Sequence, residues 1–232
     1  LHTYAPILTQ PIPELSASID FHQHSPYHRY DVYTHTAHVV EAVPKVPELR
    51  WAALLHDIGK PDAFTMDETG RGHFKGHAKI SQQIADSVLL RLKAPSALRQ
   101  QVTELIGLHM TKLEPDKKLL RRRLGKLGEE QLRQLLQLQE ADMGSKGTGK
   151  PAELAQFAEI RRLMAEIQAE NACLSLKNLA VNGRDLMALG ISGKALGETL
   201  NLLLEQVVDE QLPNEKQTLL LWAQNKIKEN TL

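Results

Sequence analysis

The sequence contains a single cysteine, Cys173, among its 232 residues. An internal disulfide therefore cannot form, which excludes the small secreted folds that disulfides stabilise and agrees with a reducing cytoplasm. One cysteine also cannot supply the thiolates of a structural zinc site. No apolar run approaches the roughly 18 residues of a membrane-spanning helix, and the first residues lack the order of a signal peptide. The sequence thus predicts a cytoplasmic protein with no membrane partner.

The sequence also has no net charge and few aromatic residues. The 28 lysines and arginines equal the 28 aspartates and glutamates, so no global field attracts nucleic acid, and any basic surface must be local. Aromatic residues make up only 4% of the chain and β-branched runs are few, which argues against a sheet of any size. What is present is an apolar fraction of 42%, enough for a substantial core, and ten histidines.

The periodic segments of the chain are helical, which predicts an all-α fold. Helices are expected at about 31–43, 48–58, 77–93, 96–110, 117–127, 129–143, 152–171, 183–189, 194–211 and 214–229. The turn residues of 61–76 predict a loop that could include a small hairpin at Thr69 and Gly70. The expected parts are an irregular N-terminal arm (1–30), a helical bundle (31–143), a linker (144–151) and a smaller C-terminal helical region (152–232). Because the chain begins with leucine, we expect it to be part of a longer polypeptide.

Histidines and aspartates recur on the apolar faces of these expected helices. At about 100° per residue, four helices each direct one such group inward, and the dipeptide HD adds two more after the apolar run WAALL. A single core histidine is more often satisfied by a backbone carbonyl than by a metal. Burying several imidazoles and carboxylates together is costly, however, unless they hold a cation. The predicted metal ligands are His35, His56, Asp57, His77, His109 and Asp142.

These ligands divide into two sets. The first is His35, His56, Asp57 and Asp142, which would leave positions open for water, as catalytic sites do. The second is His77 and His109, which could hold another ion if the Asp57 carboxylate bridges the two. Two closely spaced ions lower the pKa of a bridging water and stabilise both the attacking and the leaving oxygen of an in-line phosphoryl displacement. The pattern therefore predicts hydrolysis of a phosphate ester. Imidazole-rich ligands favour Mn²⁺, Fe²⁺, Ni²⁺ or Zn²⁺ over Mg²⁺.

The motif HDIGKP at 56–61 resembles that of the HD phosphohydrolase superfamily, and the two further histidines match its two-metal members. Several stretches are more narrowly similar to the C-terminal, HD-containing part of bacterial tRNA nucleotidyltransferases of the poly(A) polymerase type. They are YHRYDVYTHT (27–36), AALLHDIGKP (52–61), HFKGHAKIS (73–81), RRRLGKLGEE (121–130), LQEADM (138–143), LAVNGRDLMALGI (179–191) and LPNEKQTLLLWA (212–223). The resemblance implies that 31–143 form an HD domain.

The resemblance implies two different activities for such proteins. In that family a separate N-terminal α/β domain, with an acidic pair that holds magnesium, adds nucleotides to tRNA. This sequence has no D-x-D pair and no strand-rich segment, so it is not expected to add nucleotides by itself, although a nucleotidyltransferase domain could precede it. The HD part is associated with metal-dependent phosphodiesterase, 2′,3′-cyclic phosphodiesterase and phosphatase activity on nucleotides or RNA ends. The helical region after it contributes to tRNA binding.

Further residues are candidates for contact with the substrate. Lys60 follows the HD pair, and its ammonium could hold a metal-bound phosphate. The alternative is that Lys60 is only a charge at the C-terminal end of a helix, where it interacts with the helix dipole. Asp57 and Lys60 are the expected catalytic residues. Tyr27 and His28 could close over the site from the arm or be exposed. Between 116 and 126 six basic residues stand against one acid, and Arg122 could orient a phosphate, with a solvated helix face as the competing interpretation.

We therefore expect a metal-dependent phosphohydrolase that acts on nucleotides or RNA ends. Two alternatives stay open. The chain could be a non-catalytic tRNA-binding module, whose retention of tRNA would fall with rising salt and be indifferent to metal. It could also be a free-standing hydrolase of a dinucleotide, which substrate profiling would separate from the first hypothesis.

Overall fold

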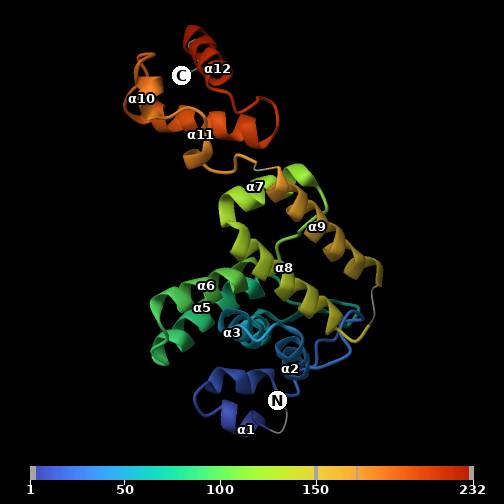
Figure 1. The fold of residues 1–232 in the computed structure, drawn as a ribbon. Helices are drawn as coiled ribbons and strands as arrows, with labels where there is room; N and C mark the ends of the chain where they lie inside the picture. The colour runs from blue at the N-terminus through green and yellow to red at the C-terminus, as the bar shows by residue number, and fades with distance from the viewer. Residues whose placement is uncertain (1–3, 149–150, 171, 230–232) are drawn as a thin grey trace. The chain divides into compact units, whose positions relative to one another are not determined.

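The computed structural model describes residues 4–148, 151–170 and 172–229, and the fold in these residues is all-α, as predicted (Figure 1). The expected linker 144–151 lies in part outside the described residues. The chain divides into two compact units, which we call the N-terminal unit (Leu1–Leu113 and Glu130–Phe157) and the C-terminal unit (Glu114–Glu129 and Ala158–Leu232). The helix expected at 117–127 thus lies in the C-terminal unit. The domain boundaries inferred from the sequence stay predictions, because compact units need not coincide with domains.

The N-terminal unit begins with two short helical turns and continues with longer helices. Its elements are α1 (Ala5–Leu8), a 3₁₀ helix (Pro13–Ser18), α2 (Val32–Ala42), α3 (Pro47–Leu55), α4 (Lys60–Ala63), β1 (Thr65–Met66), β2 (Gly72–His73), α5 (His77–Arg91), α6 (Ser96–Leu108) and most of α8 (Glu129–Gly144). The two strands pair in antiparallel register, Thr65 with His73 and Met66 with Gly72, which confirms the predicted hairpin. Helix α9 (Pro151–Ala169) follows, and its residues are divided between the two units.

Local sequence sets the ends of these helices. The carboxylate of Asp31 accepts a hydrogen bond from the Thr34 N–H and caps α2. Pro47 is the first residue of α3, where its missing N–H costs nothing. Apolar residues at helical spacing then bury one face of each helix, and a fully buried leucine contributes roughly 1.5–3 kcal/mol. The fully buried core includes Val32, Val39, Leu49, Ala52, Ala53, Leu55, Ala85, Val88, Leu89, Val102, Leu105, Ile106, Leu132, Leu135 and Leu138.

The C-terminal unit has its own apolar core. Its elements are α7 (Lys117–Leu127), a 3₁₀ helix (Leu176–Asn178), α10 (Gly183–Met187), α11 (Lys194–Val208) and α12 (Lys216–Lys228). A capping box between Asn182 and Asp185 begins α10. The core is formed by Cys173, Leu179, Val181, Leu186, Ile191, Leu203, Val207, Leu219 and Ala223. Among the helices described, none has the length and apolarity needed to cross a membrane.

Candidate metal centre

Three histidines of the N-terminal unit stand at helix ends and are held in the same way. His56 and His109 directly follow the last residues of α3 and α6, and His77 is the first residue of α5. The Nδ1–H of each donates to the carbonyl three residues earlier, over 2.8 Å in His56, 2.7 Å in His109 and 2.8 Å in His77. His35 lies within α2, and its Nδ1–H donates to the Ser145 carbonyl at 3.3 Å. With the proton on Nδ1, every Nε2 keeps a lone pair for a metal.

The four Nε2 atoms converge on the buried carboxylate of Asp57, which is 2% exposed. Its Oδ2 lies 3.2 Å from His56 Nε2 and 3.6 Å from His35 Nε2. Its Oδ1 lies 3.3 Å from His77 Nε2 and 3.8 Å from His109 Nε2. Each oxygen of one carboxylate therefore faces its own pair of imidazoles.

Asp142, on α8, joins the first of these pairs. Its Oδ1 lies 3.0 Å from His35 Nε2 and 4.0 Å from His56 Nε2. The structure thus brings together all six residues that the sequence analysis predicted as ligands. Two groups of three have ligand atoms within 4.8 Å of one another: His35, His56 and Asp57, and Asp57, His77 and His109.

The donor atoms fit a cation better than they fit one another. The buried Nε2 atoms of His35 and His56 make no hydrogen bond, because with the proton on Nδ1 each Nε2 is an acceptor, as are the nearby carboxylate oxygens. The Nε2 atoms of His77 and His109 face each other at 3.2 Å. Since both protons are on Nδ1, two lone pairs meet there, an arrangement that a divalent cation would stabilise and that is costly without a positive charge.

The charges of the centre also favour a bound cation. Burial would raise the pKa of the Asp57 carboxyl, but His56 and the Lys60 ammonium hold that pKa well below its usual value. Burial likewise would raise the pKa of the Asp142 carboxyl, but the neighbouring His35 imidazole and the Lys146 ammonium keep that pKa low. Burial would lower the pKa of His56, whereas the Asp57 carboxylate raises it above the ordinary value. The two carboxylates therefore stay ionised and draw positive charge into the pocket.

A cavity of about 340 Å³ opens onto the centre. Burial, with the ammonium groups of Lys60 and Lys146, lowers the pKa of His28 to about 3, so that its imidazole is neutral near pH 7. The cavity is lined by Ser25, Tyr27, His28, Asp57, Lys60, Arg71, Gly72, His73, Phe74, Lys75, His77, His109, Met110, Asp142 and Lys146. It thus brings three of the four expected substrate-binding residues, Tyr27, His28 and Lys60, to the same place.

Arg122, the fourth, is not among the cavity residues. It belongs to α7 in the C-terminal unit, where its Nε donates to Asp209 Oδ1 at 2.7 Å. Lys118 pairs with the same carboxylate at 3.2 Å. Much of the positive charge of the basic helix is therefore compensated within the unit, although the Lys118 and Arg122 side chains are 49% and 54% exposed. A phosphate contact by Arg122 stays a prediction.

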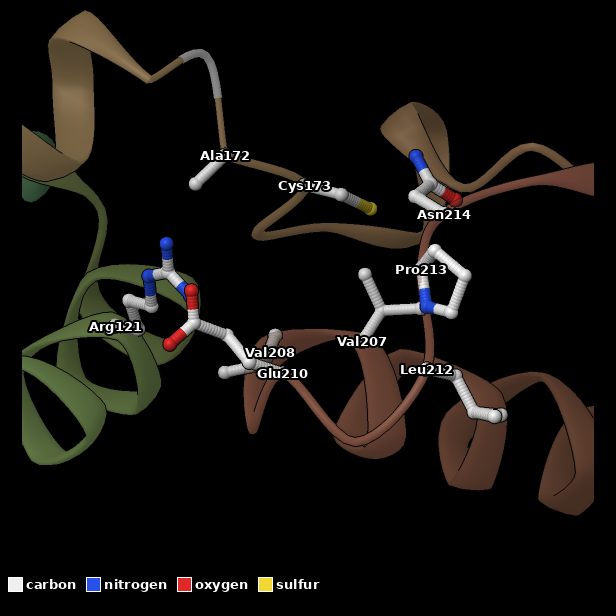
Figure 2. Close-up of a pocket in the computed structure, with 9 residues that line it drawn as sticks. All are labelled: Arg121, Ala172, Cys173, Val207, Val208, Glu210, Leu212, Pro213 and Asn214. Atoms are coloured by element: carbon white, nitrogen blue, oxygen red, sulfur yellow. The ribbon is translucent and has the colours of Figure 1, made fainter.

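A second hollow, of about 410 Å³, lies in the C-terminal unit beside α7 and α11 (Figure 2). Figure 2 shows the guanidinium of Arg121 against the Glu210 carboxylate, with which it forms an ion pair. Cys173 also lines the hollow, and burial raises the pKa of its thiol. A protonated thiol is a poor nucleophile, so the hollow gathers no catalytic set among its described lining residues.

Sequence reasoning missed several residues that support the centre. Gln23 accepts a hydrogen bond from Lys60, the Ser145 carbonyl holds His35, and Lys146 lies 3.4 Å from Asp142. The Ser81 hydroxyl accepts the N–H of Gly59 at 3.0 Å. Only Ser81 lies on the buried face of a long periodic helix; the others lie in the arm or in the segment after α8, where no period marks them.

Comparison with known proteins identifies the family. A family model described as tRNA nucleotidyltransferase domain 2 matches residues 73–223. An A-adding tRNA nucleotidyltransferase of Deinococcus radiodurans is 33% identical over 190 residues, which cover 77% of this chain and 43% of the relative. A CC-adding tRNA nucleotidyltransferase of Thermus thermophilus is 37% identical over 117 residues, which cover 48% of this chain and 27% of the relative. The chain spans less than half the length of these relatives. Since the family model covers more than half of the sequence, the chain belongs to the tRNA nucleotidyltransferase family.

Proposed function

We propose that this chain is an HD-type, metal-dependent phosphohydrolase that acts on nucleotides or RNA ends. The proposal rests on one observation: the two oxygens of the Asp57 carboxylate face two different pairs of imidazoles, with oxygen-to-Nε2 distances of 3.2–3.8 Å. A carboxylate with this surrounding is suited to bridge two divalent ions. Two-metal sites commonly hydrolyse phosphate esters.

The proposed first ion is held by His35, His56, Asp57 and Asp142, and the second by Asp57, His77 and His109. Nitrogen-rich ligands with carboxylates suit Mn²⁺, Fe²⁺, Ni²⁺ or Zn²⁺ better than Mg²⁺. When bound, such ions polarise a phosphoryl oxygen and lower the pKa of bound water. The backbone carbonyls behind each imidazole keep the ligands oriented, because they fix both the ring and its tautomer.

The remaining cavity residues are proposed to bind and orient the substrate. The ammonium of Lys60 is buried beside Asp57 and would hold a phosphate oxygen. At the cavity the guanidinium of Arg71 lies 5.0 Å from the ring centroid of Tyr27, which is 45% exposed. Arginine and tyrosine planes stack on nucleobases, so these two residues favour a nucleotide over a phosphate ester without a base.

The relatives are named for adding nucleotides to tRNA, and we therefore propose a tRNA end as the RNA substrate or partner. The non-catalytic tRNA-binding alternative draws on the same relatives. The ion pairs of Lys118 and Arg122 with Asp209 weaken one argument for it, since compensated cations release fewer counterions from a phosphate backbone.

Metal removal tests the proposal. Dialysis against a chelator is expected to abolish hydrolysis of bis(p-nitrophenyl) phosphate and of a 2′,3′-cyclic nucleotide, because the protein then lacks the charge that activates water. Readdition of Mn²⁺, Ni²⁺ or Zn²⁺ should restore it, and Mg²⁺ should restore less. Rates are measured by release of nitrophenolate and by chromatography, with dinucleotides included in the panel.

Three outcomes of this experiment would count against the proposal. Hydrolysis that is insensitive to the chelator would show that the metal centre is not its source. A protein that hydrolyses nothing with any of these ions, yet retains tRNA in a salt-dependent manner, would favour the tRNA-binding alternative. Hydrolysis confined to dinucleotides would favour the third hypothesis.

A further inference from the structure

Gln23 is a buried polar side chain of the N-terminal arm that reaches the candidate metal centre. The residue is 3% exposed. Its Oε1 accepts a hydrogen bond from Lys60 Nζ at 2.8 Å, and its Nε2 donates to the Tyr30 carbonyl at 3.0 Å. Because both ends of the amide have partners, the oxygen is fixed toward Lys60.

The backbone at Gln23 is held in place by the hairpin. The N–H of Gly72, in β2, donates to the His24 carbonyl at 2.8 Å. A Cβ atom on Gly72 would lie only 2.4 Å from the Gln23 carbonyl oxygen, so only glycine allows the arm to come this close. On the other side, the Val32 N–H donates to the Phe21 carbonyl at 3.1 Å. The position of Gln23 is thus set by contacts on both sides of it.

Among the described residues, Gln23 is one of two oxygen partners of the Lys60 ammonium. The other is Asp57 Oδ2, also at 2.8 Å. Lys60 is 4% exposed, and its Nζ lies 5.3 Å from the ring centroid of Phe74. A cation held by Asp57 would repel the ammonium. An amide oxygen, by contrast, holds the ammonium without cancelling its charge. A carboxylate at this position would hold the ammonium but cancel its charge.

We propose that Gln23 is a positioning residue that holds the Lys60 ammonium at the cavity, where the charge recognises a phosphate anion. The inference rests on the proposed function, of which it specifies one part: a neutral acceptor at position 23 fixes the Lys60 ammonium without adding a negative charge that would repel a phosphate. Gln23 itself need not touch the substrate.

The test compares three variants. Gln23→Met removes both hydrogen bonds at similar volume, Gln23→Glu pairs the ammonium with a carboxylate, and Gln101→Met, at an exposed position of α6, is the control. The affinity for inorganic phosphate is measured by calorimetry on the metal-loaded protein. The kcat and KM for bis(p-nitrophenyl) phosphate, the metal content and the melting temperature complete the set.

Both variants at position 23 are expected to weaken phosphate binding about tenfold, the size of one charge-assisted hydrogen bond. KM should rise in parallel, with kcat and metal content close to those of the wild type, a pattern that a loss of fold would not produce. In a Lys60→Met background, Gln23→Met should add nothing, because its partner is already absent. The Gln101 variant should match the wild type.

Wild-type phosphate affinity in Gln23→Glu, or additive effects in the double variant, would overturn the inference. If Gln23→Met lowers the melting temperature strongly, Gln23→Glu, which keeps an acceptor facing Lys60, carries the test. A wild-type protein that binds phosphate but hydrolyses no ester would refute the proposed function, and phosphate affinity would still decide the role of Gln23. A wild-type protein that does not bind phosphate would contradict both.

Discussion

Replacement of Asp57 by asparagine is expected to lower kcat/KM for a phosphodiester by on the order of a thousandfold. Asparagine keeps the shape of the side chain but removes its charge and directs an NH₂ group at one of the two histidine pairs. Among the described residues Asp57 is the member shared by both ligand groups, so one substitution weakens both proposed ion sites. Metal content, measured by mass spectrometry after gel filtration, should fall to less than one ion per chain.

A matched control is Asp62→Asn. Asp62 lies on α4, a few residues further along, and its side chain is exposed, so neither metal content nor rate should change. Circular dichroism verifies that both variants are folded. An Asp57→Asn protein that keeps full metal content and full activity would contradict the assignment of Asp57 as the bridging ligand.

Alanine at position 59 is expected to disturb both stability and the metal centre. Gly59 has φ −88° and ψ 3°, a conformation that alanine tolerates. The obstacle is space, since an added Cβ atom would lie 2.6 Å from the backbone nitrogen of Ser81 and 2.8 Å from Cγ2 of Ile80, both in α5. Overpacking of this kind costs about 1–3 kcal/mol, and urea denaturation measures it.

The same substitution should reduce activity, because relief of the clash moves α5 away from the HD segment. His77 begins α5 and lies 3.3 Å from Asp57, so the two ligands would separate. A displacement of about 1 Å can lower a rate on the order of a hundredfold. Gly144→Ala is the control, since a Cβ at that position meets nothing within 4 Å. Wild-type stability together with wild-type metal content in Gly59→Ala would show that α5 is not packed as described.

Much of the fold follows from the periodicity of the sequence. The apolar faces and end residues, such as Asp31 before α2 and Pro47 at the start of α3, define helices within a few residues of their observed bounds. The same periodicity explains why the inward phase of His35 and Asp142 could be anticipated, because a core-facing position on a helix is a local property. Their role as ligands stays a proposal.

Other features depend on contacts between distant segments and leave no local signal. The bond between Gln23 and Lys60 joins residues 37 positions apart, and that between Arg122 and Asp209 joins residues 87 apart. The six basic residues of 116–126 indicate a charged helix equally well whether its partners are phosphates or the acids that follow α9 and α11, namely Glu170, Asp209 and Glu210. The close approach of Gly59 to Ser81 is likewise visible only once α4 and α5 are packed.

The number and position of metal ions in the N-terminal unit test the central claim most directly. Crystals of protein loaded with Mn²⁺ or Zn²⁺, measured at the absorption edge of the metal, should give two anomalous peaks per chain. One peak is expected among His35, His56, Asp57 and Asp142, and the other among Asp57, His77 and His109. Loaded crystals with no anomalous peak beside Asp57 would contradict the account.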